Sequence, residues 1–595
     1  MATLKYHALL LILKTQGVNS FRDCVIQLNS TGGTITFDPS VTNITLTSEL
    51  DFGLSEFVID ASSSPSRVRI TNSISMTMQG TLTFLSLDLI GPGYIFSSAD
   101  LFFTNTTITG LSSSPGGNTW CIQGNAITIS NSSIDDNPGA QTGGIFYTQA
   151  SLDVSKTAVY NHSNNGIIFY ALSNTNIEHC TFTGNQIYSI VYENDNSVGG
   201  TTLAISSSTI SNNVFSAAAV VVYKCHDISL TAITFTSNSG LLFYTAFGIF
   251  YGTMYFAHST VTSNAGGAIV LQGENAYFYN NTFTENSNSC GLLTINEVVY
   301  HVQIESCNFT SNSAINAAGA AISFMYMDGN AAVLSCTFIN NTSDQGGGAI
   351  YFYYVGGDGV IYSSTFTNNS APSGGAVYVE FETIYGVTLQ ASTFTTCSAT
   401  SGDRYGGAVY SLSYLTVKDC VFTSNTASSG GAIWGQTGLP YLFTNNIFSG
   451  NTADSEGGAL WAEVSYMTFD TNTFVANQAS SGGGAFINGA LDFDSATTFY
   501  TSTFEGNRAT VHGGAMVVYA SSNLNIKYST FDDNTAPDGY ALYISPGTPL
   551  RTVSTTFWNN APTAPPTGNS NTSVHKTPLR LLFILTWDPF SISGC

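Results

Sequence analysis

The feature that most constrains the fold of this 595-residue chain is a short motif that returns at a nearly constant interval. Phe-x-x-Asn recurs every 26 to 30 residues from Phe283 to Phe557, if Phe394 is counted, whose motif ends in Cys397 instead of Asn. Degenerate copies lie upstream, and a Gly-Gly-Ala-apolar tetrad follows most of the later copies. A unit of this length that returns in register is the signature of a solenoid.

One repeat unit, residues 364–379, alternates polar and apolar residues before its Asn, which is typical of a half-buried strand. Gly, Asn, Ser and Pro interrupt the chain at short intervals, as they do between short strands and turns. Three short strands cannot bury their own apolar face, so successive units must stack, about 4.8 Å apart. We therefore predict an all-β fold, a right-handed parallel β-helix solenoid of the pectin-lyase-like type, with about 20 coils in a single elongated body.

The repeated Phe and Asn have distinct predicted roles. Phe points inward, because its neighbours are polar, and successive rings stack inside the solenoid. Asn lies at a sharp turn, where it adopts the left-handed conformation and its amide bonds to the copies above and below. Cys397 interrupts this ladder. The predicted ladder residues are Phe338, Asn341, Phe366, Asn369, Phe422, Asn425, Phe448, Asn451, Phe474, Asn477, Phe504, Asn507, Phe531 and Asn534.

The paired glycines are predicted to form the next corner of each coil, where a Cβ atom would clash with the neighbouring chain. The predicted corner residues are Gly347, Gly348, Gly374, Gly375, Gly406, Gly407, Gly430, Gly431, Gly457, Gly458, Gly483, Gly484, Gly513 and Gly514.

The paired motifs resemble the repeats of the chlamydial polymorphic outer-membrane protein family over about residues 180–560. This resemblance implies a β-helical passenger that acts at the cell surface, mainly as an adhesin. The family pattern ends in an autotransporter barrel of several hundred residues, whereas about 35 residues follow Asn560 here. The chain departs from the family pattern at that point.

The amino-acid composition restricts the classes of function that this chain can have. The net charge is −23, and 14 Lys and Arg residues are spread over the chain without a basic cluster, which argues against nucleic-acid binding. A composition rich in Ser, Thr, Asn and Gly suits an extracellular or cell-surface location, which in a bacterium would be the cell outer membrane. We expect no cofactor and no membrane span in this chain. The expected partners are cell-surface glycans, or surface proteins of a host or a neighbouring cell.

We divide the chain into four segments. Residues 1–32 form an N-terminal segment that could hold a degenerate signal peptide and a cap. Residues 33–180 form irregular β-helix coils, and residues 181–560 form the regular repeats. Residues 561–595 form a linker rich in Pro, Thr and Asn and a short apolar tail.

Four cysteines, Cys180, Cys307, Cys336 and Cys420, lie two residues before a repeat Phe and are therefore predicted to point inward. Cys307 and Cys336 occupy the same position on successive units. The sequence allows either a disulfide between them or a stack of reduced thiols. No Cys-x-x-Cys pair is present, so we expect no structural zinc site.

A polysaccharide lyase or hydrolase is the alternative function, because enzymes of both kinds use this fold. They need carboxylates that converge on one face, with a basic residue or His nearby. The best such cluster in this sequence is Arg508, His512, Asp532 and Asp533, on neighbouring units. The competing interpretation, which we favour, is that these are ordinary solvated turn residues.

Many repeat Phe residues lie between two threonines, as Phe366 lies between Thr365 and Thr367. An outward Thr-x-Thr array would suit an ice-binding protein, which is a minor alternative, although Thr also has a high strand propensity. We favour a non-catalytic secreted or cell-surface protein, adhesin-like or structural, that makes multivalent contacts along its coils. The candidate contact residues are the aromatic residues Tyr351, Tyr353, Tyr354, Trp434 and Trp461, and inward core packing is the competing interpretation for them.

Overall fold

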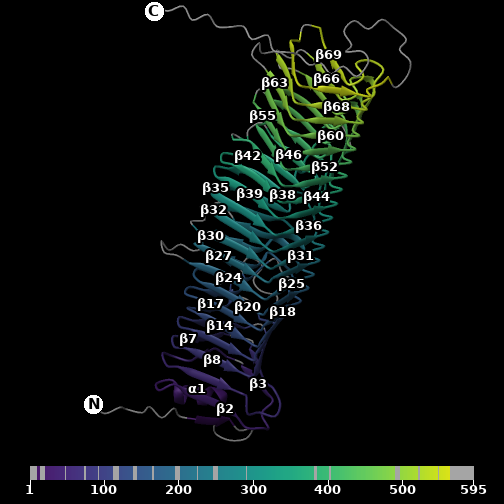
Figure 1. Ribbon diagram of the computed structural model, residues 1–595. Helices are drawn as coiled ribbons and strands as arrows, with labels where there is room; N and C mark the ends of the chain where they lie inside the picture. Colours follow the sequence, from purple (N-terminus) through teal and green to yellow (C-terminus); the bar gives the residue numbers. More distant parts are fainter. Residues whose placement is uncertain are drawn as a thin grey trace, which may run out of the picture. The chain divides into compact units, whose positions relative to one another are not determined.

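The computed structural model is built almost entirely of β-strands (Figure 1). Helix α1 (Phe21–Leu28) is the one helix among the residues that the structure describes. Those residues are 10–13 and 20–562, apart from 47, 73–74, 92, 112–119, 138–143, 164–165, 194–200, 224, 246–251, 290, 381–382, 384, 401–403, 438, 489–495, 520–522 and 547. No helix in this part of the chain is long and apolar enough to cross a membrane.

The chain divides into two compact units. Unit 1 comprises Met1–Asn288 and Leu292–Asn308, and unit 2 comprises Ser289–Gly291 and Phe309–Cys595. This division does not coincide with the predicted change from irregular to regular repeats at residue 180, so that boundary stays a prediction. The predicted tail lies outside the described residues from 563 onward.

Unit 1 begins with helix α1 and with strand β1 (Leu10–Leu13), which pairs in parallel with β2 (Gly33–Phe37). Ser20 caps α1, because its Oγ accepts a hydrogen bond from the Asp23 N–H while the Asp23 carboxylate accepts one from the Ser20 N–H. The apolar face of α1 is buried, and the Phe21 ring packs 6.5 Å from that of Phe37 in β2. The helix thus covers the apolar side of the first coil.

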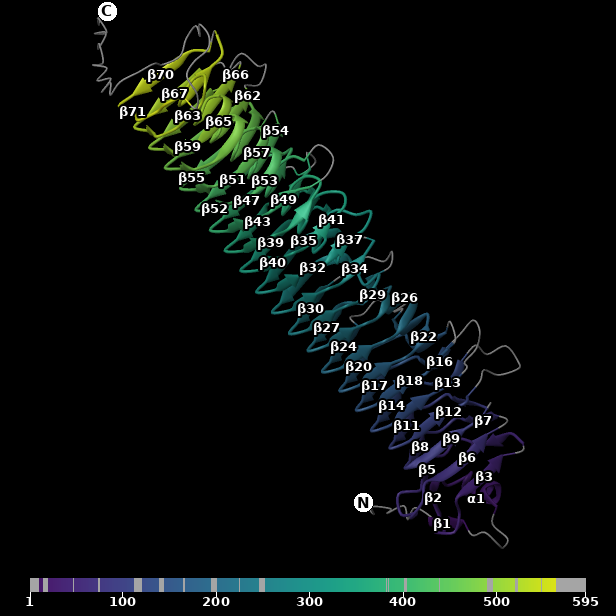
Figure 2. The ribbon, with the colours of Figure 1, turned by 90° about the vertical axis from the view of Figure 1, so that its right-hand side faces the viewer.

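Later strands of unit 1 stack in register. Strands β14 (Ile127–Ser130), β17 (Leu152–Ser155) and β20 (Thr175–Glu178) pair in parallel, one above the next (Figure 2). Their side chains alternate between buried and solvent-facing positions, as the polar–apolar alternation of the sequence predicts. The predicted fold class, an all-β right-handed parallel solenoid, is confirmed.

A regular coil of unit 2 contains four short strands, one more than the repeat unit suggests. They are β44 (Thr365–Thr367), β45 (Ser370–Ala371), β46 (Val377–Val379) and β47 (Val387–Gln390). Each pairs in parallel with its equivalent on the next coil, 28 residues later for β44. The segment after the glycine corner makes two strands instead of one, which the repeated motif does not reveal.

The predicted internal stack of Phe rings is confirmed. Phe366 and Phe394 are fully buried, and their rings lie 4.6 Å apart and 4° from parallel. The predicted amide ladder is confirmed as well. Asn451 donates from its backbone N–H and its Nδ2 to Asn477 Oδ1, at 2.9 Å each, and from Nδ2 to the Phe422 carbonyl at 3.0 Å. Asn451 Oδ1 in turn accepts from the Asn425 N–H, so each amide satisfies backbone groups of the preceding coil and bonds to the amide of the next coil.

The predicted left-handed conformation of the ladder Asn is wrong. The residue immediately before it carries the positive φ instead, as in Asn368 at 54°, Ala476 at 54° and Asp533 at 50°. The physical reason is that the ladder Asn must point its side chain inward to reach the next coil. The preceding residue makes the turn, and it is exposed or half-buried.

A second ladder, which the sequence motif does not reveal, flanks each Phe on its other side. The residue two positions before Phe accepts a hydrogen bond from its equivalent on the previous coil. Ser364 donates its N–H to Ser392 Oγ at 3.1 Å, and Cys420 donates its N–H to Asn446 Oδ1 at 2.8 Å. Ser, Asn, Cys or Thr stands at most of these positions and Ile233 at one, so no single residue type marks the ladder in the sequence.

The four inward-pointing cysteines belong to this second ladder and are buried, as predicted. No disulfide joins Cys307 to Cys336, so the reduced alternative holds for them. Cys397 lies in the Asn ladder itself. Its N–H still donates to Asn425 Oδ1 at 2.9 Å, but a thiol replaces the amide that the other coils supply.

The glycine corners are confirmed with one correction. Gly430 has a φ of 63°, and a Cβ atom on Gly431 would lie 2.1 Å from the Gly458 carbonyl oxygen. The predicted corner pair Gly483 and Gly484 is one residue too late, because Gly482 carries the positive φ of 64°. Gly484 takes the place of the alanine of the tetrad, since Ala485 pairs with Leu460.

Candidate functional site

The four predicted catalytic residues lie on two neighbouring coils of unit 2, on strands β65 and β68 and in the turn after β68. Arg508 and His512 are the two ends of β65 (Arg508–His512), whereas Asp532 ends β68 (Thr530–Asp532) and Asp533 makes the left-handed turn. Asp532 accepts a hydrogen bond from Asn559 Nδ2 at 3.2 Å. Within the described part of the chain, no ion pair joins Arg508 to either aspartate.

His512 has a different acidic neighbour, which the sequence analysis missed. Its Nδ1 lies 3.3 Å from the Asp538 carboxylate, and its ring lies 4.5 Å from that of Tyr543. About a third of each side chain is exposed, at 31% for His512 and 30% for Asp538. The two residues are bridged across adjacent coils, so their proximity follows from the strand register. No group of three His, Cys, Asp or Glu side chains within the described ranges could hold a metal ion.

Trp434 and Trp461 are not exposed contact residues, so that prediction is wrong. They alternate with the inward-facing Ile433 and Leu460 along β54 (Ile433–Thr437) and β58 (Leu460–Val464), yet only 5% and 9% of their surface is exposed. Their rings stack on each other at 4.8 Å, and Trp434 also stacks on Tyr410 at 4.6 Å. They belong to a hydrophobic cluster that also includes Phe486 and Val517, and this packing excludes solvent from them.

Tyr351, Tyr353 and Tyr354, on β42 (Ile350–Val355), are half-buried. Thr365 is exposed and Thr367 is half-buried, so the predicted outward orientation of the threonine array is correct at this coil.

Unit 1 has a surface of aromatic and polar side chains that the sequence analysis missed. Its side chains are exposed or half-buried, and regular strands hold them in place. It lies on three neighbouring strands, β30 (Thr253–Ala257), β32 (Ile269–Tyr279) and β35 (Leu293–Glu305). Tyr255 and Tyr279 are 51% and 47% exposed. We call this surface the tyrosine platform and define it by Tyr255, Tyr277, Tyr279, His301, Gln303 and Glu305.

The strand register fixes the positions of the platform residues. Tyr255 pairs with Tyr277, Tyr277 with Gln303, and Tyr279 with Glu305, so they form a grid on one face. The Tyr255 and Tyr277 rings stack at 5.3 Å. The sequence did contain a signal for it, because Tyr277 and Tyr279 alternate with the buried residues Ala276 and Phe278.

Hydrogen bonds link the polar members of the platform. Gln303 Nε2 donates to Glu305 Oε2 at 2.7 Å, and Gln303 Oε1 lies 3.4 Å from His301 Nε2. At the adjoining turn, Asn280 Nδ2 lies 3.0 Å from His258 Nδ1, and the His258 ring meets the edge of Tyr279. The platform therefore offers aromatic rings beside several hydrogen-bonding groups that the strands hold in place.

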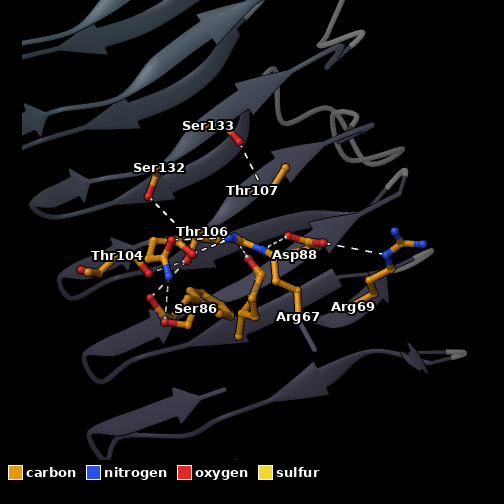
Figure 3. Close-up of polar contacts among 12 residues, drawn as sticks. Arg67, Arg69, Ser86, Asp88, Thr104, Thr106, Thr107, Ser132 and Ser133 are labelled. Carbon is orange, nitrogen blue, oxygen red and sulfur yellow. Dashed lines mark hydrogen bonds and ion pairs between the residues drawn. The ribbon is translucent and has the colours of Figure 1, made fainter. Parts of the chain in front are cut away.

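A second surface of unit 1 is an open groove with a volume of about 630 Å³ on the outer face of its early coils. It lies over β3 (Asn43–Leu46), β6 (Val68–Asn72) and β9 (Leu87–Ile90). We call it the arginine groove; the lining residues that matter here are Asn43, Ser66, Arg67, Arg69, Thr71 and Asp88. Figure 3 shows Arg67 and Arg69 on either side of Asp88.

Comparisons with known proteins agree with the fold. The chain matches the family described as "Right handed beta helix region" over residues 93–215, 196–353, 324–492 and 430–576, and it belongs to that family. A search of curated proteins finds no match.

Among solved structures, the chain is similar to a mutant of the PL6-family alginate lyase AlyGC. The TM-score is 0.28 and the identity 11%, over 93% of this chain and 89% of that one. The AlyGC structure itself gives a TM-score of 0.21 and 9% identity, over 92% and 100%. Likenesses this weak carry no argument about function.

Proposed function

We propose that this protein is a non-catalytic, secreted or cell-surface repeat protein that binds glycans on the outer faces of its coils, in the manner of an adhesin. The observation that carries the proposal is the tyrosine platform. Two of its tyrosines are about half exposed, although each lies within a regular strand. Contiguous exposed apolar surface marks interaction sites, whereas single exposed side chains do not, and the Tyr255 and Tyr277 rings are in contact.

The chemistry of the platform suits a sugar ligand. A hexose presents an apolar ring face and a rim of hydroxyl groups, which tyrosine rings and hydrogen-bonding side chains can contact together. Gln303 supplies both a donor and an acceptor, and Glu305 supplies acceptors. The strands hold these side chains before binding, which lowers the entropy cost of association.

The composition supports a surface location for this activity. Charged residues make up 9% of the chain, and acidic residues outnumber basic ones by 37 to 14. Such a protein has little attraction for nucleic acids. Repeated weak contacts along the solenoid would add up to firm attachment, provided that several sites engage the same surface.

The proposal is tested by retention of the full chain on immobilised neutral polysaccharides. We expect Tyr255→Ala and Tyr279→Ala each to weaken retention about ten-fold, because truncating a central aromatic contact typically costs more than 1 kcal/mol. Tyr466→Ala is the matched control, since Tyr466 is also 47% exposed but lies in unit 2. Equal retention of all four proteins would contradict the platform as the binding surface.

A further inference from the structure

The arginine groove carries charge chemistry that the tyrosine platform lacks. The Arg67 guanidinium already makes hydrogen bonds within the protein. Its Nε donates to Asp88 at 2.6 Å, and its Nη2 donates to the carbonyls of Asn105 and Leu87 at 2.7 and 3.1 Å. Arg67 therefore joins the groove to the next coils, and it holds the Asp88 carboxylate in one orientation.

Arg69 is held much more loosely. Its Nε lies 3.8 Å from the Asp88 carboxylate, and its side chain is 65% exposed. Arg69 and Thr71 face outward from β6, because Val68 and Ile70 between and before them are fully buried. Arg69 lines the groove, and its terminal guanidinium nitrogens make no hydrogen bond to the described part of the protein.

We infer that the arginine groove binds a sugar that carries an oxyanion, either a carboxylate or a sulfate, with the Arg69 guanidinium as its main anchor. The planar guanidinium fork matches a carboxylate or sulfate with two parallel hydrogen bonds. Asn43 pairs with Arg69 from the neighbouring coil, and Thr71 lies two residues after Arg69 on β6. Thr71 Oγ1 donates to Asn43 Oδ1 at 3.4 Å, and the Asn43 Nδ2 supplies a donor for the sugar hydroxyls. Asp88 adds an acceptor on the other side.

The charges near the groove support this assignment. Arg67, Arg69 and Asp88 sum to one positive charge in a chain whose net charge is −23. The groove is thus a local positive site on an acidic protein, and it takes one acidic sugar residue of a glycan. Salt should weaken the interaction, because the anchor is exposed.

The inference rests on the proposed function in that both ligands are glycans, but the two sites lie on different strands and take different chemistry. Their failures can therefore be separated. If the protein binds neutral glycans but no acidic glycan, the proposal for the arginine groove is wrong and that for the platform stands. If it binds acidic glycans but no neutral glycan, the proposal for the platform is wrong and that for the groove stands.

The experiment is affinity electrophoresis of the full chain in gels that contain polygalacturonate, a sulfated glycan or a neutral dextran. We expect the wild type to be retarded by one of the acidic glycans, and Arg69→Gln to bind it about ten-fold more weakly. Arg69→Lys should restore only part of the binding, because lysine lacks the fork. Retardation by polygalacturonate would identify the bound oxyanion as a carboxylate, and retardation by the sulfated glycan would identify it as a sulfate.

Arg551→Gln is the matched control, because it removes the same charge from another exposed arginine, on β70 (Leu550–Val553). The groove assignment is supported if Arg551→Gln binds like the wild type while Arg69→Gln does not. It is overturned if the wild type is not retarded by either acidic glycan, or if both substitutions weaken binding equally, which would indicate a general charge effect.

Discussion

At the scale of single residues, the buried amides explain why Asn returns in nearly every coil. A parallel solenoid leaves backbone N–H and C=O groups at each turn that the strands cannot pair. The Asn side chain is short enough to stay inside the turn, and it has both a donor and an acceptor. In the second ladder Ser, Asn, Thr and Cys share the equivalent place in most coils, because a hydroxyl or an amide there can accept from the previous coil, as Ser392 and Asn446 do.

Asn451→Ala tests this role. The substitution leaves the backbone N–H and Nδ2 of Asn425 without their shared acceptor and removes a donor to the Phe422 carbonyl. A buried group left unpaired costs about 1–3 kcal/mol, so we expect a loss of at least about 2 kcal/mol in unfolding free energy. Faster amide hydrogen exchange around residue 425 would confirm that the Asn425 N–H has lost its acceptor. The control, Thr423→Ala, changes a half-buried outward residue and should cost less than about 0.5 kcal/mol.

The buried thiols should make the stability of the protein depend on pH. Burial raises the pKa of Cys420 from its ordinary value near 9 to about 12. The unfolded chain therefore loses this proton before the folded protein does, so the thiol's contribution is present below pH 9 and falls as pH rises toward 12. We expect unfolding free energy to decline more steeply above pH 9 in the wild type than in Cys420→Ser. Equal slopes in denaturant titrations would contradict it.

At the scale of elements, the corner between β53 (Thr426–Ser429) and β54 depends on the absence of a side chain. The Cβ atom of an alanine at position 431 would lie 2.1 Å from the carbonyl oxygen of Gly458, which is backbone and cannot move away easily. The turn glycine Gly506 has a different reason to be glycine. Its φ is 60°, but nothing lies within 4 Å of a Cβ atom there.

These two glycines form a matched pair of substitutions. Gly506→Ala should cost about 1–2 kcal/mol, the price of the left-handed conformation alone. Gly431→Ala should cost clearly more, because it also forces two backbones apart. Thermal unfolding of both variants measures the difference. Equal losses would mean that the close approach at residue 431 can relax.

The sequence predicted the elements that depend on one residue type. Phe366, Asn369 and the turn glycine Gly374 are required by geometry, so their identity repeats. The platform could not be found in this way, because Tyr255 and Gln303 occupy equivalent positions but share no residue type. Trp434 illustrates the opposite error, since an outward-facing aromatic residue need not be exposed when its neighbours on adjacent coils stack against it.

At the scale of the whole molecule, each coil should behave as a separable unit, because it contacts mainly its neighbours. Deleting residues 426–451 removes the 26 residues between two equivalent Asn positions and joins Asn425 to Thr452, the partner of Thr426. We expect this protein to fold, with the circular dichroism spectrum of a β-solenoid and a modest loss of stability. Deleting residues 426–437 instead destroys the register and should give a far less stable protein. Similar stabilities would contradict the repeat as the folding unit.

The most direct test of the proposed function is one incubation of the full chain with a panel of acidic and neutral polysaccharides. New reducing ends and unsaturated products are measured beside retention of the protein on each polymer. Our account predicts retention without product. Product release that disappears in Asp532→Ala/Asp533→Ala would contradict it and make the protein a polysaccharide lyase or hydrolase.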